Sequence, residues 1–473
     1  MEDKTKSRQM KPLNSIRLGG REVLPLIEGG KGISISSGLS SGPWALAGGI
    51  GTISAVNADF CDDAGNPVPQ IYHGRTRLDR HNELVKYAID GGVTQVKKAH
   101  ELRNGSGSLN INILWEMGAA ERILHAVLER TKGLVHGVTC GAGMPYKLAE
   151  ICSGYGVHYY PIISSARAFS ALWKRAYRKF ADFLGAVVYE DPWLAGGHNG
   201  LSNQEDPKVP EDPYPRVRLL RERMREFGLD ETPIIMAGGV WYLRDWEDWI
   251  DSKELGPVAF QFGTRALLTK ESPISDAWKE RLMTLKDGDV LLHRFSPTGF
   301  YSSAVRNNYL KELEERNERQ IAFSIEEVGD HTAELKLVRA RPVYVTPGDL
   351  LRGKKWMKMG YTEALRTPDQ TLIFVTRERR ESIRRDQVDC MGCLSQCLFS
   401  NWADNEKHSS GRKADPRSFC IQKTLQDIAH NGSIQENLMF AGHNAFNFRK
   451  DPFYSNGFVP TVKQLVERIQ TGD

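Results

Sequence analysis

Residues 233–265 read PIIMAGGVWYLRDWEDWIDSKELGPVAFQFGTR and contain two strand patterns that each end in glycine. Residues 233–237 and 258–262 are apolar nearly throughout, which is typical of parallel strands covered on both faces. Residues 242–252 between them have a helix-like pattern. A strand, a helix and a second strand in this order predict parallel strands joined by a right-handed crossover.

The same alternation extends over residues 20–290. Six further apolar segments fit strands, at residues 24–27, 51–56, 109–114, 134–139, 157–163 and 186–190. Helix-like stretches follow at residues 82–102, 119–132, 145–155, 167–184, 214–227 and 273–285, whereas residues 41–48 give only a short, glycine-rich helix pattern. Eight such units predict closure into a (β/α)₈ TIM barrel, an α/β fold of roughly 250 residues.

An open, doubly wound sheet is the alternative fold. It predicts a Gly-x-Gly-x-x-Gly motif after the first strand, followed at once by a helix. Here Gly29-Gly30-Lys31-Gly32 has a different spacing, and no helix pattern follows it directly. The barrel is therefore favoured.

The chain has 473 residues, which is more than a barrel requires. We expect an N-terminal arm at residues 1–20, the barrel at residues 21–290, and a C-terminal extension of mixed α+β structure at residues 291–473. In the extension, residues 321–328 and 333–338 alternate in polarity and are joined through Gly329-Asp330-His331, which predicts a hairpin. Residues 462–469 predict a helix.

Composition narrows the class of protein. The 40% hydrophobic and 26% charged residues are typical of a globular protein, and the net charge of +4 requires neither nucleic acid nor a membrane as a partner. Residues 1–12 are polar, unlike a signal peptide. No apolar run approaches the ~18 residues of a membrane span. We therefore expect a soluble cytoplasmic protein.

Glycine-rich loops follow the last two predicted strands. Ala237-Gly238-Gly239-Val240 follows the seventh, and Phe262-Gly263-Thr264-Arg265 follows the eighth. Glycines let backbone N–H groups approach an anion closely, and a helix start adds its positive dipole end. Because these two loops of the barrel fold often bind phosphate, they predict a phosphate-bearing cofactor, although two ordinary tight turns would look the same.

The sixth predicted strand is followed by Ala195-Gly196-Gly197-His198-Asn199-Gly200. Barrel active sites lie in such loops, and histidine can donate or accept a proton near neutral pH. The position favours a catalytic His198 over a histidine that only holds the loop. Asn112, between Ile111 and Ile113, is a buried amide that needs partners, which a flavin edge or neighbouring backbone would supply.

Together these motifs resemble the nitronate monooxygenase family, formerly called 2-nitropropane dioxygenases, and the related flavin-type enoyl-acyl-carrier-protein reductases. The similarity runs over about residues 25–271 and rests on residues 111–114, 139–145, 196–200, 237–239 and 261–265. It implies a barrel that binds FMN, with His198 beside the reacting substrate.

The resemblance also implies roles for individual residues. It places the FMN phosphate at Gly238, Gly239, Gly263 and Thr264. It assigns further cofactor contacts to Asn112, Thr139, Glu190 and Gly197. Two stretches depart from the family pattern, namely residues 27–34 after the first strand and the bulky, charged residues 190–193.

Four of the seven cysteines gather near the end of the chain, at Cys390, Cys393, Cys397 and Cys420. An odd total argues against a disulfide framework. Four thiolates can hold zinc or a [4Fe–4S] cluster. With one Cys-x-x-Cys pair instead of two, the spacing favours the cluster, with zinc and plain thiols as alternatives. The loop also resembles the cluster loop of iron–sulfur flavoenzymes related to 2,4-dienoyl-CoA reductase.

Three functions fit this sequence. The first is FMN-dependent oxidation of an alkyl nitronate or a similar small acidic carbon compound, with dioxygen as electron acceptor. The second is reduction of an activated C=C bond, with electrons supplied through an iron–sulfur cluster. An acidic electron-carrier protein would then dock on the basic residues between Lys354 and Arg385, which otherwise form a solvated surface. The third is an RNA-binding or assembly factor with a basic tail and a zinc knuckle.

Overall fold

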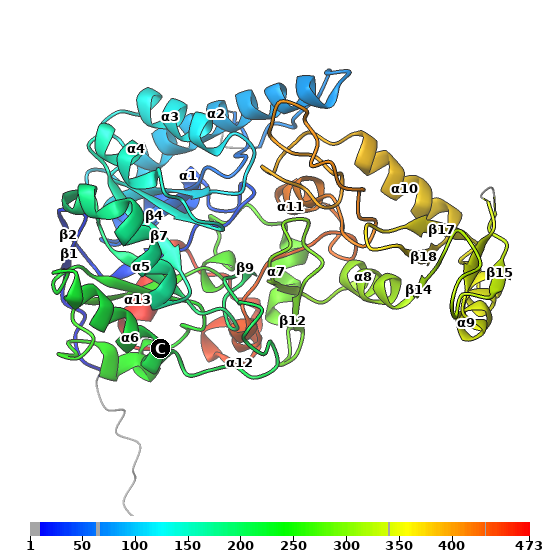
Figure 1. Ribbon diagram of the computed structural model, residues 1–473. Helices are drawn as coiled ribbons and strands as arrows, with labels where there is room; N and C mark the ends of the chain where they lie inside the picture. The colour runs from blue at the N-terminus through cyan, green and yellow to red at the C-terminus, as the bar shows by residue number, and fades with distance from the viewer. Residues whose placement is uncertain (1–9, 63–66, 339–340, 431) are drawn as a thin grey trace, which may run out of the picture.

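The computed structural model describes residues 10–62, 67–338, 341–430 and 432–473 (Figure 1). Eight parallel strands form a closed barrel in the order β10-β11-β3-β4-β5-β6-β7-β8. Their bounds are β3 Leu26–Glu28, β4 Ile50–Ser54, β5 Ser108–Leu114, β6 Gly137–Gly141, β7 His158–Ile163, β8 Val187–Glu190, β10 Ile234–Ala237 and β11 Val258–Phe262. Each overlaps one expected strand, so the α/β barrel is confirmed and the open sheet is wrong.

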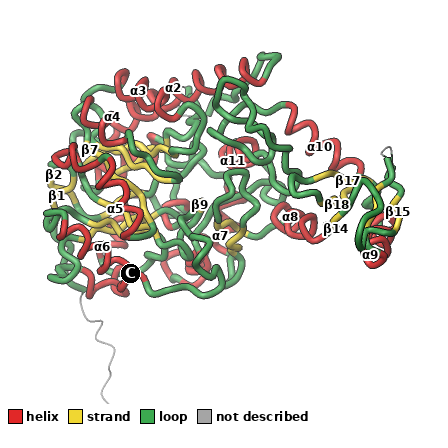
Figure 2. The backbone as a smooth tube through the Cα atoms, viewed as in Figure 1, coloured by secondary structure: helices red, strands yellow, loops and turns green. Residues whose placement is uncertain are grey.

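Helices cover the outside of the barrel, as Figure 2 shows in red around the yellow strands. They are α1 Gly38–Leu46, α2 Arg77–Leu102, α3 Ala120–Arg130, α4 Leu148–Gly154, α5 Ala166–Arg175, α6 Pro213–Glu226 and the 3₁₀ segments η1 Tyr177–Phe183, η2 Leu243–Trp249 and η3 Arg265–Leu267. The weak pattern after the first strand is therefore a true helix, α1. The helix expected over residues 167–184 is divided, because Ala176 leaves helical backbone geometry.

Alternation along the strands separates the barrel interior from the layer under the helices. On β8, Val187 and Tyr189 pack in the outer core, whereas Val188 packs in the interior cluster. The same parity directs Glu190, at the end of β8, toward the interior. On β5, Ile111 and Ile113 pack outward, so Asn112 faces the interior as well.

The extension begins after α7 (Asp276–Met283) and builds several small elements. Strands β12 (Val290–His293) and β13 (Ser302–Val305) form an antiparallel sheet with the two-residue strand β9 (Gly197–His198). Further along the chain lie α8 Asn308–Glu318, β14 Gln320–Ala322, β15 Ala333–Leu335, β16 Val343–Val345, α9 Pro347–Lys358, β17 Glu363–Arg366, β18 Thr371–Val375 and α10 Arg377–Val388. Figure 1 shows β14–β18 and α9 at the end of the molecule away from the barrel.

The hairpin expected between residues 321–328 and 333–338 is wrong. Strand β14 pairs with β18, and β15 pairs with β16. The bridge between Val328 and His331 closes the expected connection and does not pair the two arms. The apolar alternation was real, but strands further along the chain supply the partners.

The end of the chain returns to the barrel. After α11 (Ile421–Ala429), η4 (His443–Phe446), α12 (Asn447–Lys450) and η5 (Pro452–Gly457), the expected helix appears as α13 (Val462–Gln470). Its side chains Val462, Leu465, Val466 and Ile469 are buried in the main core of the barrel. Among the helices of the described residues, none is both long and apolar enough to cross a membrane.

Candidate functional site

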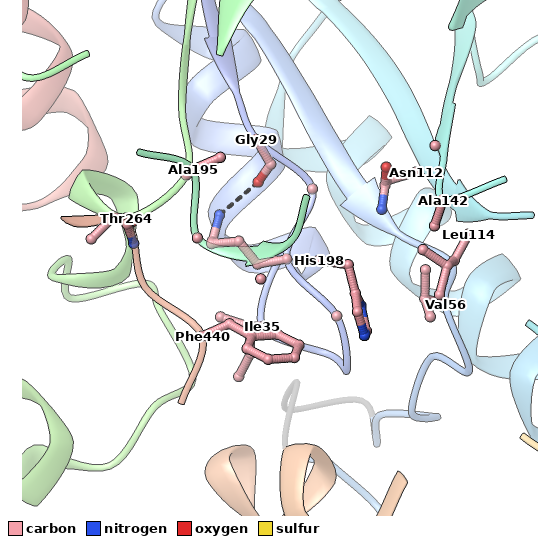
Figure 3. Close-up of a pocket in the computed structure, with 18 of the residues that line it drawn as sticks. Gly29, Ile35, Val56, Asn112, Leu114, Ala142, Ala195, His198, Thr264 and Phe440 are labelled. Atoms are coloured by element: carbon pink, nitrogen blue, oxygen red, sulfur yellow. Dashed lines mark hydrogen bonds between the residues drawn. The ribbon is translucent and has the colours of Figure 1, made fainter. Parts of the chain in front are cut away.

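A cavity of about 230 Å³ opens at the carboxyl ends of the barrel strands. The catalytic residue expected from the sequence and all eight expected cofactor residues line it, namely His198, Asn112, Thr139, Glu190, Gly197, Gly238, Gly239, Gly263 and Thr264. Figure 3 shows several of them around the same space. Motifs spread over more than 150 residues of sequence therefore meet in one place.

The register of the paired strands determines where the polar residues of this cavity lie along the barrel axis. Asn112 on β5 lies opposite Thr139 on β6. Glu190 on β8 lies opposite Ala237 on β10, directly before the first glycine loop. Because the strands are parallel, these residues all stand at the carboxyl end, where a barrel binds its ligands.

The two glycine loops form a cradle of the kind that a phosphate needs. Gly238 and Gly239 both have left-handed backbone, with φ of 87° and 79°. A Cβ on Gly239 would lie 2.7 Å from Leu194 Cδ1, whereas a Cβ on Gly263 would meet no protein atom within 4 Å. Gly263 therefore borders open space, and the backbone of both loops is accessible to an anion. This arrangement fits the FMN phosphate that the sequence resemblance implies.

Residues from the end of the chain hold the cradle in place. The backbone N–H of Gly442 donates to Thr264 Oγ1 at 2.7 Å, and Asn444 Nδ2 donates to the Gly239 carbonyl at 2.5 Å. The sequence reading did not find Gly442 or Asn444. No local motif marks them, since their partners lie 178 and 205 residues away.

His198 lies on strand β9 and not in a free loop. Its backbone pairs with Ser302 of β13, and its Nε2 is 2.7 Å from Ser296 Oγ, which in turn bonds Thr298 Oγ1. The ring of Phe440 packs edge-on against the imidazole, with centroids 5.3 Å apart (Figure 3). Burial lowers the pKa of His198 to about 4, so the ring is neutral at neutral pH.

Glu190 is the acidic group of the cavity. Burial, with a smaller effect from the neighbouring Asp191, raises the pKa of Glu190 to about 8. The carboxyl is therefore mainly protonated at pH 7 and can donate a hydrogen bond to a ligand. A carboxyl group with a raised pKa and an imidazole with a lowered pKa in one cavity are typical of a functional site.

The segment after the first barrel strand, which departs from the family pattern, also lines the cavity. Lys31 Nζ donates to Glu28 Oε1 at 3.1 Å and to the Gly29 carbonyl at 2.9 Å. Glu28 is 1% exposed and also accepts from Ser40 Oγ. The structure thus places a paired, largely buried cation in the wall of the cavity.

The C-terminal extension forms the wall opposite the barrel. It contributes Cys393, Leu394, Ile421, Gln422, Leu425, Ile428, Leu438, Met439 and Phe440. Most of these side chains are apolar, and several come from the single helix α11. The barrel alone would leave this side of the cavity open to water.

The expected cysteine site is not formed as a metal-ion centre. Within the described ranges, no three His, Cys, Asp or Glu side chains are placed to hold a metal ion. Cys390, Cys393, Cys397 and Cys420 are free thiols that share one hydrophobic cluster. This arrangement supports neither the zinc interpretation nor the expected iron–sulfur cluster.

Apart from Arg366 on β17, the basic residues between Lys354 and Arg385 lie on α9 and α10. Several have acidic partners: Arg379 pairs with Glu312 at 3.5 Å, and Arg380 pairs with Glu363 at 3.4 Å. These pairs fit a solvated surface, and docking of an acidic carrier protein on it stays a prediction.

Comparisons with solved structures found several similar proteins, and the first named here supports the barrel fold. The enoyl reductase domain of MlnA from the macrolactin biosynthesis cluster of Bacillus amyloliquefaciens is similar with a TM-score of 0.53, 13% identity and coverage of 95% of this chain and 93% of that chain. FabK from Thermotoga maritima gives a TM-score of 0.49, 16% identity and coverage of 95% and 92%. Nitroalkane oxidase from Streptomyces ansochromogenes gives 0.44, 18%, and 61% and 78%.

At 13% identity, the similarity to the MlnA domain shows the fold alone. No curated protein sequence matches the chain. The sequence model of the nitronate monooxygenase family, in contrast, matches residues 95–376, which is more than half of the chain and includes His198 and both glycine loops. The match begins later and ends later than the similarity expected from the motifs. The chain belongs to the nitronate monooxygenase family and is an FMN-dependent oxidoreductase of that family.

Proposed function

We propose that this enzyme oxidises an alkyl nitronate or a similar small acidic carbon compound, with His198 next to the flavin and the substrate. The observation that carries the proposal is the meeting of His198, Asn112 and both glycine loops in one cavity. When bound there, FMN supplies two-electron redox chemistry, with dioxygen as the final acceptor. The chain itself binds, orients and shields the reactants.

The FMN contacts follow from the geometry of the loops. Backbone N–H groups at Gly238, Gly239 and Gly263 and the Thr264 residue would hold the phosphate. Asn112, Thr139, Gly197 and the protonated Glu190 would contact the rest of the cofactor from the strand ends. Apolar side chains of α11 would then exclude water from the reacting face.

His198 is suited to handle a proton or to stabilise an anion. Its imidazole is neutral at neutral pH, so it can accept a proton from a carbon acid or donate a hydrogen bond to a nitronate oxygen. Among the hydrogen bonds of the described residues, only Nε2 has a partner, Ser296, which leaves Nδ1 for the substrate. Ser296 acts as a positioning residue, because it fixes the tilt of the ring.

The test is His198→Ala in the full-length protein, measured as oxygen consumption with an alkyl nitronate. We expect turnover to fall by 10²-fold or more, as is typical for loss of an acid–base group, while bound FMN stays at the wild-type level. Ser296→Ala should lower turnover less and shift the pH profile, because the ring loses its orientation. Nitronate turnover that survives in His198→Ala would contradict the proposed role.

The apolar wall formed by the extension favours a second candidate. Ile421, Leu425, Ile428 and Leu438 would suit an acyl chain better than a small polar nitronate. The enzyme would then reduce an activated C=C bond beside His198. Anaerobic enzyme that is chemically reduced and mixed with an enoyl thioester separates the two: consumption of the C=C bond without nitronate oxidation would favour the reductase.

A further inference from the structure

Lys31 brings a positive charge into the wall of the flavin cavity. It belongs to residues 29–32, which follow β3, line the cavity and depart from the family pattern, and its side chain is 12% exposed. Among the lining residues that the structure describes, the other titratable side chains are Glu190, His198 and Cys393. Burial raises the pKa of Glu190 and of Cys393 and lowers the pKa of His198, so these three are mainly neutral at pH 7. Lys31 is therefore the one charged side chain of this lining.

The acidic partner of Lys31 lies behind the wall of the cavity. Lys31 Nζ donates to Glu28 Oε1 at 3.1 Å. Leu26 packs in the outer core and Ile27 in the interior cluster, so alternation along β3 directs Glu28 outward, toward the helices. There Ser40 of α1 donates to Glu28 Oε1 at 3.0 Å, and Glu28 does not line the cavity. The ion pair therefore has its positive end toward the cavity.

Lys31 also keeps a hydrogen-bond donor for a ligand. A lysine ammonium group has three N–H donors. Within the described ranges, two of them are used, one by Glu28 Oε1 and one by the Gly29 carbonyl at 2.9 Å, the bond drawn dashed in Figure 3. The third N–H and the positive charge are available to an anionic group in the cavity.

The loop that carries Lys31 packs tightly against the FMN contacts assigned above. A Cβ on Gly30 would collide with the side chain of Asn112, and a Cβ on Gly29 would lie 3.1 Å from Gly263 Cα. The loop thus passes between the amide at the end of β5 and the glycine loop after β11. This packing fixes the position of Lys31 beside the proposed cofactor site.

We propose that Lys31, paired with Glu28, raises the reduction potential of FMN bound in this cavity. The oxidised ring system of FMN is neutral, and uptake of two electrons and one proton makes it a monoanion. A cation in a wall that excludes water stabilises the anion more than the neutral form. The inference rests on the proposed binding of FMN in this cavity, and it does not depend on the substrate.

The experiment measures the reduction potential of FMN in the full-length holoenzyme, without substrate, by anaerobic reduction beside a reference dye at pH 7. Lys31→Met removes the charge and keeps the length of the side chain. We expect the Kd for reduced FMN to rise about tenfold relative to the Kd for oxidised FMN, which lowers the two-electron potential by about 30 mV. Lys31→Arg keeps the charge and should restore most of the wild-type potential.

Glu28→Gln should change the potential in the opposite direction. It removes the negative end of the pair and leaves the ammonium group in the wall, so the potential should rise above that of the wild type. A merely structural role of the pair would move both variants in the same direction, because either change disturbs the same loop. Lys147→Met is the matched control. Lys147 pairs with Glu121 at 2.9 Å on the surface and does not line the cavity, so this variant should keep the wild-type potential.

Several results would overturn the proposal. Equal potentials in the wild type and Lys31→Met would do so, as would a fall of the potential in Glu28→Gln. If Lys31→Met weakens binding of FMN but not of riboflavin at an unchanged potential, the cation binds the phosphate instead.

Two further outcomes are also decisive. If Lys31→Met fails to fold because Glu28 is left unpaired, the double variant of Lys31→Met with Glu28→Gln, which buries no unpaired charge, should still have a lower potential than the wild type. A double variant at or above the wild-type potential would contradict the proposal. Wild-type protein that binds no FMN would overturn the proposed function as well, whereas unchanged potentials of bound FMN would overturn this inference alone.

Discussion

At the scale of single residues, strand parity decides which side chains reach the cavity. Asn112 stands between two isoleucines that pack outward, so its amide had to face the barrel interior. The same parity brings Glu190 into the cavity. The extent of burial, in contrast, could not be predicted from the sequence. Burial raises the pKa of Glu190, which keeps its carboxyl protonated, and lowers the pKa of His198, which keeps its imidazole neutral.

The protonated state of Glu190 leads to a prediction about pH. The pKa of Glu190 is raised to about 8, so the carboxyl is neutral at pH 7 and becomes charged as the pH rises through 8. A carboxylate there would repel the anionic cofactor. We expect the Kd of wild-type enzyme for FMN to rise up to about tenfold per pH unit above pH 8, because only the protonated form then binds well.

Glu190→Gln provides the control for this effect, because glutamine stays neutral and resembles the protonated acid in shape. FMN affinity of the variant should be close to wild type at pH 7 and independent of pH up to 9. Quenching of flavin fluorescence measures both Kd values. If the Kd for FMN rises equally with pH in the wild-type enzyme and in Glu190→Gln, a group other than Glu190 causes the rise.

At the scale of elements, the barrel could be predicted, whereas in the extension the last helix, α13, was predicted and the expected hairpin was not formed. The barrel strands are short, largely apolar runs, each with a glycine or proline at its start or within two residues before it, and each pairs with a strand set by the barrel order. Of the two expected arms, β14 pairs with the distant strand β18 and β15 pairs with the following strand β16, which is why the expected hairpin failed. Strand β9 has only two residues, which lie among glycines and show no apolar alternation, so no local sequence pattern predicted it.

In the glycine loop after β10, the effect of a substitution on backbone strain can be measured separately from its effect on FMN binding. Gly239→Ala should cost about 1–2 kcal/mol of unfolding free energy, because alanine is strained at positive φ. It should also weaken FMN binding by at least tenfold, since the Cβ meets Leu194 and displaces the cradle. Urea unfolding and flavin fluorescence measure the two effects.

Gly228→Ala is the matched control. Gly228 has nearly the same φ, 74°, but a Cβ there would meet no atom within 4 Å, and the residue lies after α6 away from the cavity. We expect a similar loss of stability with unchanged FMN affinity. An equal loss of FMN affinity in both variants would mean that the effect comes from stability and not from the cradle.

At the scale of the whole molecule, the barrel and the extension form one site. The extension supplies Gly442 and Asn444 to the glycine loops, Ser296 to His198 and α11 to the cavity wall. The sequence predicted a boundary between barrel and extension at residue 290, because composition and periodicity change there. It could not show that the later segments complete the cavity, since these contacts join residues about 100 to 200 positions apart.

A buried ion pair between the barrel and the C-terminal segment tests whether that segment stabilises the barrel. Arg265, directly after Thr264, lies 3.3 Å from Asp451, and both side chains are fully buried. Asp451→Asn leaves the guanidinium without its charge partner, which should cost about 3–5 kcal/mol of unfolding free energy and lower FMN affinity through the adjacent Thr264. Replacing both, as Arg265→Met with Asp451→Asn, should cost less than the sum of the single changes. Glu226→Gln, which breaks the exposed pair with Arg223, should leave the unfolding midpoint unchanged. If Asp451→Asn is as mild as this surface change, the C-terminal segment does not stabilise the barrel through this pair.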